Sequence, residues 1–314
     1  MIPSHPLETL PPTKQPVALA LGNFDGLHIG HAAVIQNATT AAQQLNGQAW
    51  VFTFHPHPRQ ILNPETAPPL LSTPQQQNRQ LAQLGITTAI RQPFNETFRQ
   101  LTPEQFFQHL QTHIPSLSAI SVGTDWSFGR NRAGNAQLLE QYCQEHNIHF
   151  TAQPPVEHEQ QRVSSTRIRT AISTGNLTQA AAMLGRPFAI QGTVVHGEKI
   201  GRQLGYPTAN IDPHNECLPP NGVYAAQLQL DGTAYDAAAY IGDRRTIHAD
   251  KPTVLEVHLL RQKNIDLYTK EVEITFLETI RGDQKFENTE ELKKQIARDL
   301  QAIDRALING IKNA

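Results

Sequence analysis

Two histidines in a glycine-rich stretch, His28 and His31, are the residues of this 314-residue chain best placed to do chemistry. They lie in the run Gly22–His31, which follows an apolar segment, Val17–Leu21, and precedes a segment with a helical pattern. A strand, a glycine-rich turn and a helix together point backbone N–H groups and a helix N-terminus at a phosphate. Side chains three residues apart share one helix face, so both imidazoles can donate to phosphate oxygens. The alternatives are a metal site or two ordinary surface histidines, and neither a cysteine nor a third ligand that would favour a metal lies near them in the sequence.

A second candidate phosphate site is the run Arg162–Arg169, which opens another helical segment. We expect Ser165 or Thr166 to cap that helix, and either hydroxyl could also face a phosphate. Arg162 and Arg169 supply positive charge on either side of the cap. The alternative is an ordinary cap with solvated arginines, and the presence of the histidine turn in the same chain favours phosphate binding.

A third candidate site lies in the second half of the chain, in the run His196–Asn210. The run contains three glycines spaced four residues apart: Gly197, Gly201 and Gly205. This spacing suits a flap of exposed backbone N–H donors over phosphates, although an ordinary hairpin connection is the alternative. Thr208 and Asn210 are neutral oxygen ligands of the kind that hold Mg²⁺ beside nucleotide phosphates.

Glu256 is a carboxylate in an otherwise apolar strand pattern, Val254–Leu260. A carboxylate among apolar residues needs a hydrogen-bonding or charged partner, or else it has a functional role. The alternative is a glutamate on the exposed face of an edge strand.

The first half of the chain alternates strand and helix patterns. The expected strands are Val17–Leu21, Ala49–Phe54, Ile86–Ile90, Ala119–Val122 and Ile148–Thr151, and the expected helices cover 32–45, 75–84, 103–113 and 136–146. Such alternation predicts an α/β fold, a Rossmann-like domain with a parallel sheet. Ligands in these sheets bind at the carboxyl ends of strands, where three loops fall: the Gly22 turn, His55–Pro58 and Gly123–Asp125.

The pattern changes after Gly185. Downstream lie short segments with a period of two, at Ala189–Val195, Val223–Leu230, Asp236–Ile241, Val254–Leu260 and Lys270–Phe276. They predict an antiparallel β-barrel, followed by a C-terminal amphipathic helix that is capped by Asn288 and lies on the barrel. We therefore predict two domains, residues 1–185 and 186–314.

The composition limits the partners. The formal charge is −2 and basic residues are not clustered, which argues against nucleic-acid and membrane partners. The N-terminus lacks the apolar core of a signal peptide, and no apolar run approaches the ~20 residues of a membrane span. The two cysteines, Cys143 and Cys217, form no C-x-x-C pair. We expect a cytoplasmic protein that is a monomer or a weak homo-oligomer.

Taken together, both halves resemble the bifunctional riboflavin kinase/FMN adenylyltransferases, the prokaryotic FAD synthetases, over nearly the whole length. The matching segments of the first half are Gly22–His31, Thr53–Pro58, Gly123–Gly129 and Ser164–Arg169. The matching segments of the second half are Gly201–Asn210, with the family pattern G-R-x-L-G-[FY]-P-T-A-N, and Gly222–Tyr224. These motifs occur in the family's order, and their combination is very specific.

The resemblance implies roles in an adenylyl transfer for the first half. His28 and His31 would stabilise the α-phosphate of ATP while the phosphate of FMN attacks it in line and pyrophosphate leaves. Positioning and charge stabilisation matter more in such a reaction than an acid or a base. The implied phosphate- and ATP-binding residues are Gly22, Phe24, Asp25, Gly30, Arg162, Ser165, Thr166 and, with a catalytic role, Arg169; the implied flavin-side residues are His57, Asp125 and Trp126.

The resemblance implies a kinase for the second half. Glu256 would be the base for the ribityl hydroxyl of riboflavin, and Thr208 and Asn210 would bind Mg²⁺ with ATP. The implied ATP-binding residues are Gly197, Lys199, Gly201 and Arg202, with Tyr206 on the flavin side. The substrates would be riboflavin, FMN and ATP, with FMN and FAD as intermediate and product.

The sequence departs from the family pattern at four positions. Tyr240 and Arg245 lie where the family has N-I-G-x-x-P-T, Thr269 replaces the glycine of L-Y-G-K, and Trp126 replaces a common Phe. Because Thr208, Asn210 and Glu256 are present, we expect an active kinase with an altered substrate pocket.

Three other functions would account for parts of this sequence. The H-I-G-H string also occurs in class I aminoacyl-tRNA synthetases, but this chain has no K-M-S-K-S element and no basic surface. Another nucleotidyltransferase of the same superfamily would explain the first domain but not the barrel. A non-catalytic flavin-binding protein remains an alternative for the second domain, because of the altered loops.

Overall fold

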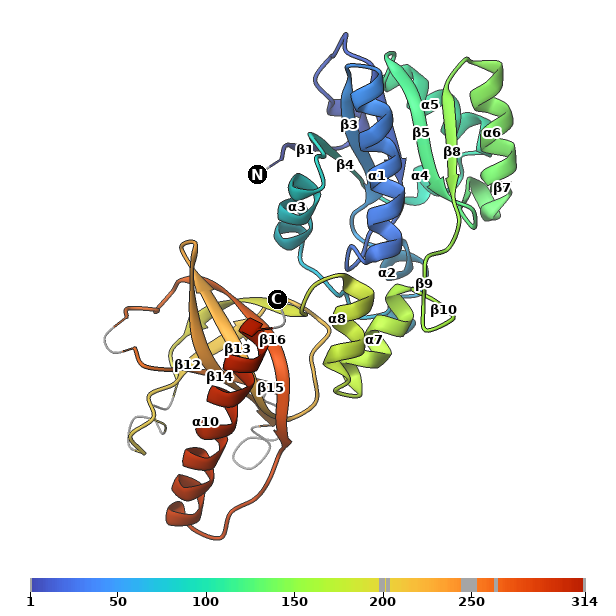
Figure 1. Ribbon diagram of the computed structural model, residues 1–314. Helices are drawn as coiled ribbons and strands as arrows, with labels where there is room; N and C mark the ends of the chain where they lie inside the picture. The colour runs from blue at the N-terminus through green and yellow to red at the C-terminus, as the bar shows by residue number, and fades with distance from the viewer. Residues whose placement is uncertain (1, 198–200, 202–203, 244–252, 263–264, 313–314) are drawn as a thin grey trace. The chain divides into compact units, whose positions relative to one another are not determined.

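The computed structural model describes residues 2–197, 201, 204–243, 253–262 and 265–312. Contacts divide the chain into two compact units, and each has its own core (Figure 1). The first unit is Met1–Pro68 with Pro74–Ser164, and the second is Pro69–Thr73 with Ser165–Ala314. No helix of the described chain is long and apolar enough to cross a membrane.

A six-stranded, fully parallel sheet organises the first unit. Its strands, in spatial order, are β1 (Ser4–His5), β4 (Thr88–Gln92), β3 (Gln48–Phe54), β2 (Val17–Leu21), β5 (Leu117–Gly123) and β8 (His149–Gln153). The helices of this unit are α1 (Ile29–Gln44), α2 (Pro58–Leu62), α3 (Pro74–Gln83), α4 (Glu96–Arg99), α5 (Pro103–His113) and α6 (Ala136–Glu145). Two short hairpins pair β6 (Ser127–Phe128) with β7 (Gly134–Asn135), and β9 (Glu157–His158) with β10 (Gln161–Arg162). The predicted α/β class is confirmed.

Strand β2 shows why the sheet is buried on both faces. Its larger side chains, Val17, Leu19 and Leu21, belong to the core that includes residues of α5 and α6. Its small residues, Ala18 and Ala20, belong to the other core, which includes the inner face of α1. Alternate residues of a strand point to opposite faces, so small residues on one face let a helix approach closely. Figure 1 shows α1 lying along the sheet on that face.

A closed, antiparallel six-stranded barrel organises the second unit. Its strands, in spatial order, are β11 (Ala189–Val195), β12 (Ala209–Pro213), β15 (Thr253–Leu259), β14 (Thr233–Asp243), β13 (Gly222–Leu230) and β16 (Glu271–Gly282). The predicted barrel is confirmed, but β12 was not predicted as a strand. It lies at the end of the run that we had expected to be a loop.

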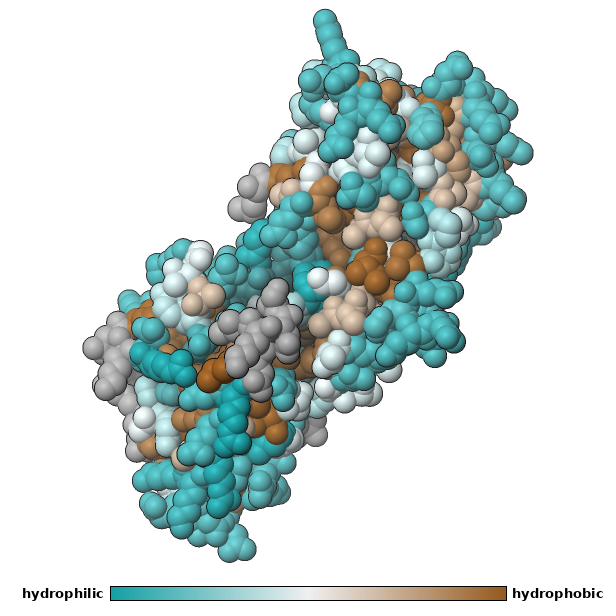
Figure 2. All heavy atoms as spheres, viewed as in Figure 1, coloured by the Kyte–Doolittle hydropathy of each residue, from teal (hydrophilic) through white to brown (hydrophobic). Residues whose placement is uncertain are grey.

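The C-terminal helix α10 (Thr289–Lys312) packs on the barrel, as predicted. Ile303 and Leu307 are buried against Val223 and other residues of the barrel's outer side. The Asn288 side chain accepts a hydrogen bond from the N–H of Glu291 at 2.9 Å, so Asn288 is the predicted cap. The side of α10 visible in Figure 2 is hydrophilic, in agreement with an amphipathic surface helix.

Two helices precede the barrel, α7 (Ser165–Ser173) and α8 (Leu177–Leu184). We had placed them at the end of the first domain, and by contacts they group with the barrel. The segment Pro69–Thr73, which the chain reaches between α2 and α3, also groups with the barrel. The functional division at 185/186 stays a prediction.

Candidate active sites

The histidine turn lies at the carboxyl end of β2, which is the point where the sheet's order reverses. Strand β2 pairs with β3 on one side and with β5 on the other, and the chain reaches β3 first, through α1. The loops that follow β3 and β5 therefore lie beside the turn at the same edge of the sheet. In open α/β sheets this crevice is where ligands bind.

The backbone of the turn is strained. Phe24 and Leu27 have φ values of 42° and 39°, in the left-handed region that non-glycine residues rarely adopt. Both side chains are buried, which holds the turn in this conformation. A Cβ atom on Gly22 would lie 2.8 Å from the Phe24 ring, so that position needs a glycine. Such strain costs about 1–3 kcal/mol per residue and is concentrated at functional sites.

His28 and His31 form a stacked pair at the start of α1. The ring centroids are 3.6 Å apart with an interplanar angle of 16°, and the ring of Phe24 contacts His31 edge-on at 5.4 Å. His28 is the N-cap of α1, and its Nδ1 accepts from the N–H of His31 at 3.1 Å. The neutral His28 ring therefore carries its proton on Nε2. This cap explains why α1 begins at Ile29, three residues earlier than we predicted.

His31 is held neutral by its surroundings. Burial lowers its pKa well below the ordinary value, and the positive charge of Arg162 lowers it further. Its Nδ1 is buried and has no hydrogen-bond partner within the described part of the chain. Gly30 lies against the pair, because a Cβ atom there would be 3.2 Å from the His28 ring. The turn therefore presents two neutral imidazoles at a helix N-terminus.

The flavin-side residues of the prediction lie in the neighbouring loops. Asp125, after β5, forms an ion pair with Arg162 of β10, which joins a predicted flavin residue to a predicted phosphate residue. Trp126 packs against the core that includes residues of α5 and α6. Its buried indole Nε1 has no hydrogen-bond partner in the described structure. His57 caps α2 by accepting from the N–H of Arg59 at 3.2 Å. Asp25 of the histidine turn is buried.

Ser165, Thr166 and Arg169 lie on α7 and belong to the second unit. Ser165 and Thr166 are the first two residues of this helix, where we had expected one of them to precede it as the cap. The Nε atom of Arg169 donates to the carbonyl oxygen of Pro69 at 2.6 Å. That these three residues bind the phosphates of the same ATP as the histidine turn stays a prediction.

Within the barrel, three predicted site residues meet. Asn210 on β12 lies directly opposite Glu256 on β15, and the Thr208 hydroxyl donates to Glu256 Oε2 at 3.1 Å. The Glu256 carboxylate therefore has a partner, and its strand is not an edge strand, because β15 pairs with both β12 and β14. A hydroxyl, an amide oxygen and a carboxylate side by side are hard oxygen donors, the set that suits Mg²⁺.

Two of the glycines in the predicted flap are needed for close approach. A Cβ atom on Gly197 would lie 2.0 Å from Asn210 Nδ2, and one on Gly201 would lie 3.0 Å from Thr208 Oγ1. These glycines therefore let the backbone pass directly against the two candidate metal ligands. Lys199 and Arg202 lie outside the described residues.

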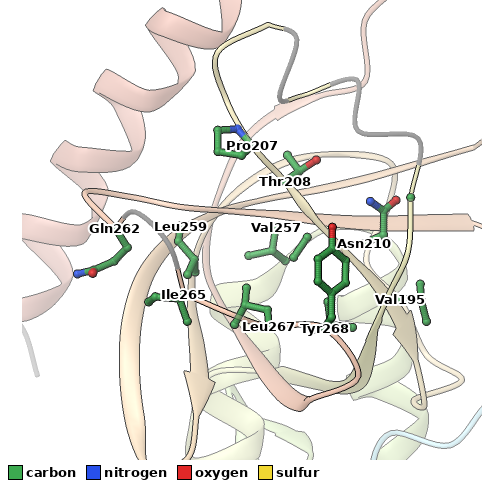
Figure 3. A pocket seen from close by; sticks show the side chains of 13 residues that line it. Val195, Pro207, Thr208, Asn210, Val257, Leu259, Gln262, Ile265, Leu267 and Tyr268 are labelled. Atoms are coloured by element: carbon green, nitrogen blue, oxygen red, sulfur yellow. The ribbon is translucent and has the colours of Figure 1, made fainter.

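A cavity of about 170 Å³ opens beside these residues (Figure 3). Thr208 and Asn210 line it together with apolar side chains that include Leu259, Ile265 and Leu267. Tyr268 also lines it and stacks on His196, with ring centroids 4.4 Å apart. We had not predicted these lining residues, although Leu267 and Tyr268 belong to the L-Y-G-K motif. The predicted flavin residue Tyr206 does not line the cavity; its ring contacts His258 edge-on at 5.9 Å.

Besides Trp126, two of the departures from the family pattern lie within the described residues. Tyr240 lies opposite Glu256 on β14 and donates to Asp283 Oδ1 at 3.1 Å; burial and the Asp283 charge raise its pKa to about 12. Thr269, where the family has glycine, has a φ of 62°, so it adopts the left-handed backbone that glycine adopts freely. Arg245 and Thr246 lie outside the described residues.

Comparison with known proteins gives the same assignment for both halves. The family model described as FAD synthetase matches residues 10–167, and the one described as riboflavin kinase matches residues 184–307. A curated bifunctional riboflavin kinase/FMN adenylyltransferase from Escherichia coli is 35% identical over 94% of this chain and 93% of that protein. The protein of the same name from Bacillus subtilis is 32% identical over 98% of this chain and 97% of that protein.

Among solved structures, a protein from Streptococcus pneumoniae described as a macrolide-efflux protein has a similar fold. It superposes with a TM-score of 0.85, at 30% sequence identity, and covers 95% of this chain and 97% of that one. The parallel α/β domain followed by a β-barrel and a C-terminal helix is thus a fold that exists in a solved structure.

Proposed function

Since this chain belongs to the family of bifunctional riboflavin kinase/FMN adenylyltransferases and makes FMN and FAD, we propose which residues perform each of its two reactions. The adenylyl transfer is assigned to the histidine turn and the kinase reaction to the centre formed by Thr208, Asn210 and Glu256. The observation that carries the assignment is the contrast between their side chains: two neutral imidazoles at a helix N-terminus, and a carboxylate among oxygen donors.

In the adenylyl transfer, an oxygen of the FMN phosphate bonds to the α-phosphorus of ATP while the bond from that phosphorus to the β-phosphate oxygen breaks. The nucleophile is already ionised, so no base is needed. His28 donates from Nε2 to the α-phosphate, because its Nδ1 already accepts from the backbone. His31 donates from its own ring, and both donors stabilise the charge that grows in the transition state.

The remaining residues of this reaction bind the substrates. Ser165, Thr166, Arg162 and Arg169 hold the β- and γ-phosphates that leave as pyrophosphate. His57, Asp125 and Trp126 lie on the flavin side. These assignments rest on the matching motifs and on the position of the three loops at one edge of the sheet.

In the kinase reaction, Glu256 accepts the proton of the ribityl hydroxyl as that oxygen bonds to the γ-phosphorus of ATP. Thr208 and Asn210 would hold Mg²⁺, which when bound neutralises phosphate charge. The hydrogen bond from Thr208 orients the Glu256 carboxylate and leaves lone pairs of the hydroxyl oxygen for a cation. Gly197, Lys199, Gly201 and Arg202 bind ATP, and Tyr206 lies on the flavin side.

We place the enzyme in the cytoplasm, as a monomer or a weak homo-oligomer without nucleic-acid or membrane partners. The near-neutral charge of −2 and the absence of a C-x-x-C pair support this proposal. Cys143 and Cys217 are both buried as free thiols, in keeping with a reducing compartment.

The test is chromatography of the products after incubation of the protein with Mg²⁺–ATP and either riboflavin or FMN. We expect FMN and FAD from riboflavin, and FAD from FMN, with both reactions lost when Mg²⁺ is chelated. FAD from FMN alone would overturn the assignment of the barrel centre as a working kinase site. Retention of the kinase reaction without a divalent cation would overturn the metal assignment of Thr208 and Asn210.

A further inference from the structure

The segment Pro69–Thr73, here called the strap, is bound closely to the barrel unit although its neighbours in the chain belong to the first unit. Three successive carbonyl oxygens of the strap accept hydrogen bonds from the barrel unit. Pro69 O accepts from Arg169 Nε at 2.6 Å, Leu70 O from the N–H of Cys217 at 3.2 Å, and Leu71 O from Asn215 Nδ2 at 3.0 Å. The backbone of the first three strap residues is therefore held by the barrel unit.

The strap is held mainly by one loop of the barrel and by strand β11. Glu216 accepts from the N–H of Leu70 at 2.8 Å, and the hydroxyl of Thr73 donates to Gln191 on β11. Asn215 connects the two, because its Oδ1 accepts from the N–H of Gln191 at 2.9 Å while its Nδ2 donates to the strap. The contacts of Thr73 and Asn215 are buried, because Leu71, Thr73, Gln191 and Asn215 are each less than a tenth exposed, whereas the contact of Glu216 with Leu70 is exposed. Buried polar groups arranged in this way are rigid, since breaking one leaves an unsatisfied partner.

The strap contacts a residue of the adenylyl-transfer assignment. A guanidinium group is planar, so a hydrogen bond that holds its Nε–H fixes the plane in which its other N–H donors lie. Pro69 O supplies that bond to Arg169. The helix that carries Arg169 is anchored next to it by Ile168, which is fully buried.

We propose that the strap, held in place by Asn215 and Glu216 of the barrel, positions Arg169 for the phosphates of ATP in the adenylyl transfer. Residues in the part of the chain that matches riboflavin kinase thus serve the other reaction. Asn215 and Glu216 are positioning residues, because they act through the strap. The proposal rests on the role of Arg169 assigned above.

The test compares variants of the full-length protein in both reactions. Asn215→Asp keeps the oxygen that accepts from Gln191 and loses the donor to Leu71 O, and Glu216→Ala removes the acceptor for Leu70. We expect each to raise the ATP KM of the adenylyl transfer by about tenfold, with kcat within about twofold and the kinase constants unchanged. Thr193→Val is the matched control, because it breaks a 3.0 Å contact with His214 of the same loop without touching the strap.

A double-mutant cycle separates positioning from a general loss of structure. In an Arg169→Ala background, Asn215→Asp and Glu216→Ala should have no further effect on the ATP KM. The proposal would be overturned if either variant raised the ATP KM as much in the Arg169→Ala background as in the parent protein. It would also be overturned if the variants lowered the rates of both reactions equally. An Arg169→Ala protein with an unchanged ATP KM would instead overturn the assigned role of Arg169, which the single variant tests on its own.

Discussion

In the assignment we propose, the histidine turn and the Thr208–Glu256 centre bind the same cosubstrate, ATP, with opposite kinds of side chain. The turn offers neutral rings: His28 is bound to the backbone through Nδ1, and the pKa of His31 is depressed by burial. The barrel centre offers a carboxylate hydrogen-bonded to a hydroxyl and paired across strands with an amide. The contrast is thus between the imidazole pair His28–His31 and the carboxylate of Glu256.

The difference follows from the two nucleophiles. The phosphate of FMN is ionised before it attacks, so the first reaction needs donors that stabilise growing negative charge. The ribityl hydroxyl must lose a proton, so the second reaction needs a base close to the bound phosphates. The first reaction therefore needs no base, whereas the second site could not activate the alcohol without one.

The largest expected effect comes from removing the base. Glu256→Gln keeps an oxygen that can accept from Thr208 but cannot take up the proton of the ribityl hydroxyl. We expect the kinase rate to fall about 10²–10⁴-fold, while FAD formation from FMN is unchanged. Product chromatography with each substrate measures both rates. If the variant kept the parent's kinase rate, Glu256 would not be the base of the kinase reaction, and the contrast between the two sites would not hold.

The corresponding change in the first site is His31→Phe. It keeps a ring to stack on His28 and contact Phe24, and it removes both nitrogens. We expect FAD formation from FMN to fall about 10²–10³-fold, the usual cost of losing one donor to a developing charge. The kinase reaction of the same preparation is the internal control. An unchanged rate of FAD formation would exclude His31 as a donor in the transition state.

A smaller effect is expected from Gly197→Ala. Its Cβ atom would lie 2.0 Å from Asn210 Nδ2, so the Asn210 side chain must move. We expect the Mg²⁺ concentration for half-maximal kinase activity to rise roughly tenfold, as for other changes that displace a metal ligand. Gly282→Ala is the matched control on the barrel, because its Cβ atom would meet nothing within 4 Å. Equal Mg²⁺ requirements in the two variants would contradict the metal role of Asn210.

The smallest effect concerns stability and pH. The pKa of His31 is lower in the folded protein than its ordinary value of 6.5, first because of burial. The unfolded chain therefore binds this proton at a higher pH, so the contribution to stability is full above about pH 6.5 and is lost as the pH falls towards the lowered pKa. His31→Phe should reduce the acid-side slope of the free energy of unfolding by up to one proton, about 1.4 kcal/mol per pH unit.

Tryptophan fluorescence suits this measurement, because both tryptophans, Trp50 and Trp126, lie in the first unit. Urea unfolding between pH 7.5 and 5 should give the two slopes. The pKa of His55 is also lowered, by burial and by Arg91, but it contributes equally to both proteins. Identical slopes would show that His31 titrates alike in the folded and unfolded states.

The sequence was most informative where chemistry and local structure are contiguous. The histidine turn could be predicted because its strand, glycines and helix follow one another between Val17 and Gln44. The α/β and barrel classes followed from the periods of the apolar residues, and the structure confirms both. The start of α1 was predicted three residues too late, because His28 caps through a ring nitrogen, which is not among the usual Ser, Thr, Asp and Asn signals.

Features that depend on distant residues could not be predicted. Strand β12 was expected to be a loop, because its five residues pair with β11 and β15 only once the barrel closes. The contact between Thr208 and Glu256 joins residues 48 apart, and no local pattern encodes that distance. The cavity residue Tyr268 was missed for the same reason, although the motif around it was recognised.

The strap has a consequence for the order in which the chain folds. Its bonds to Gln191, Asn215 and Glu216 span 118 to 146 residues, so its partners are synthesised on the order of ten seconds after the strap itself. In that interval the parallel sheet can form, while Leu70 and Leu71 still lack the barrel that they pack with in the finished protein. We therefore expect the nascent first unit to display a short apolar segment that chaperones can bind, until the barrel closes and withdraws it.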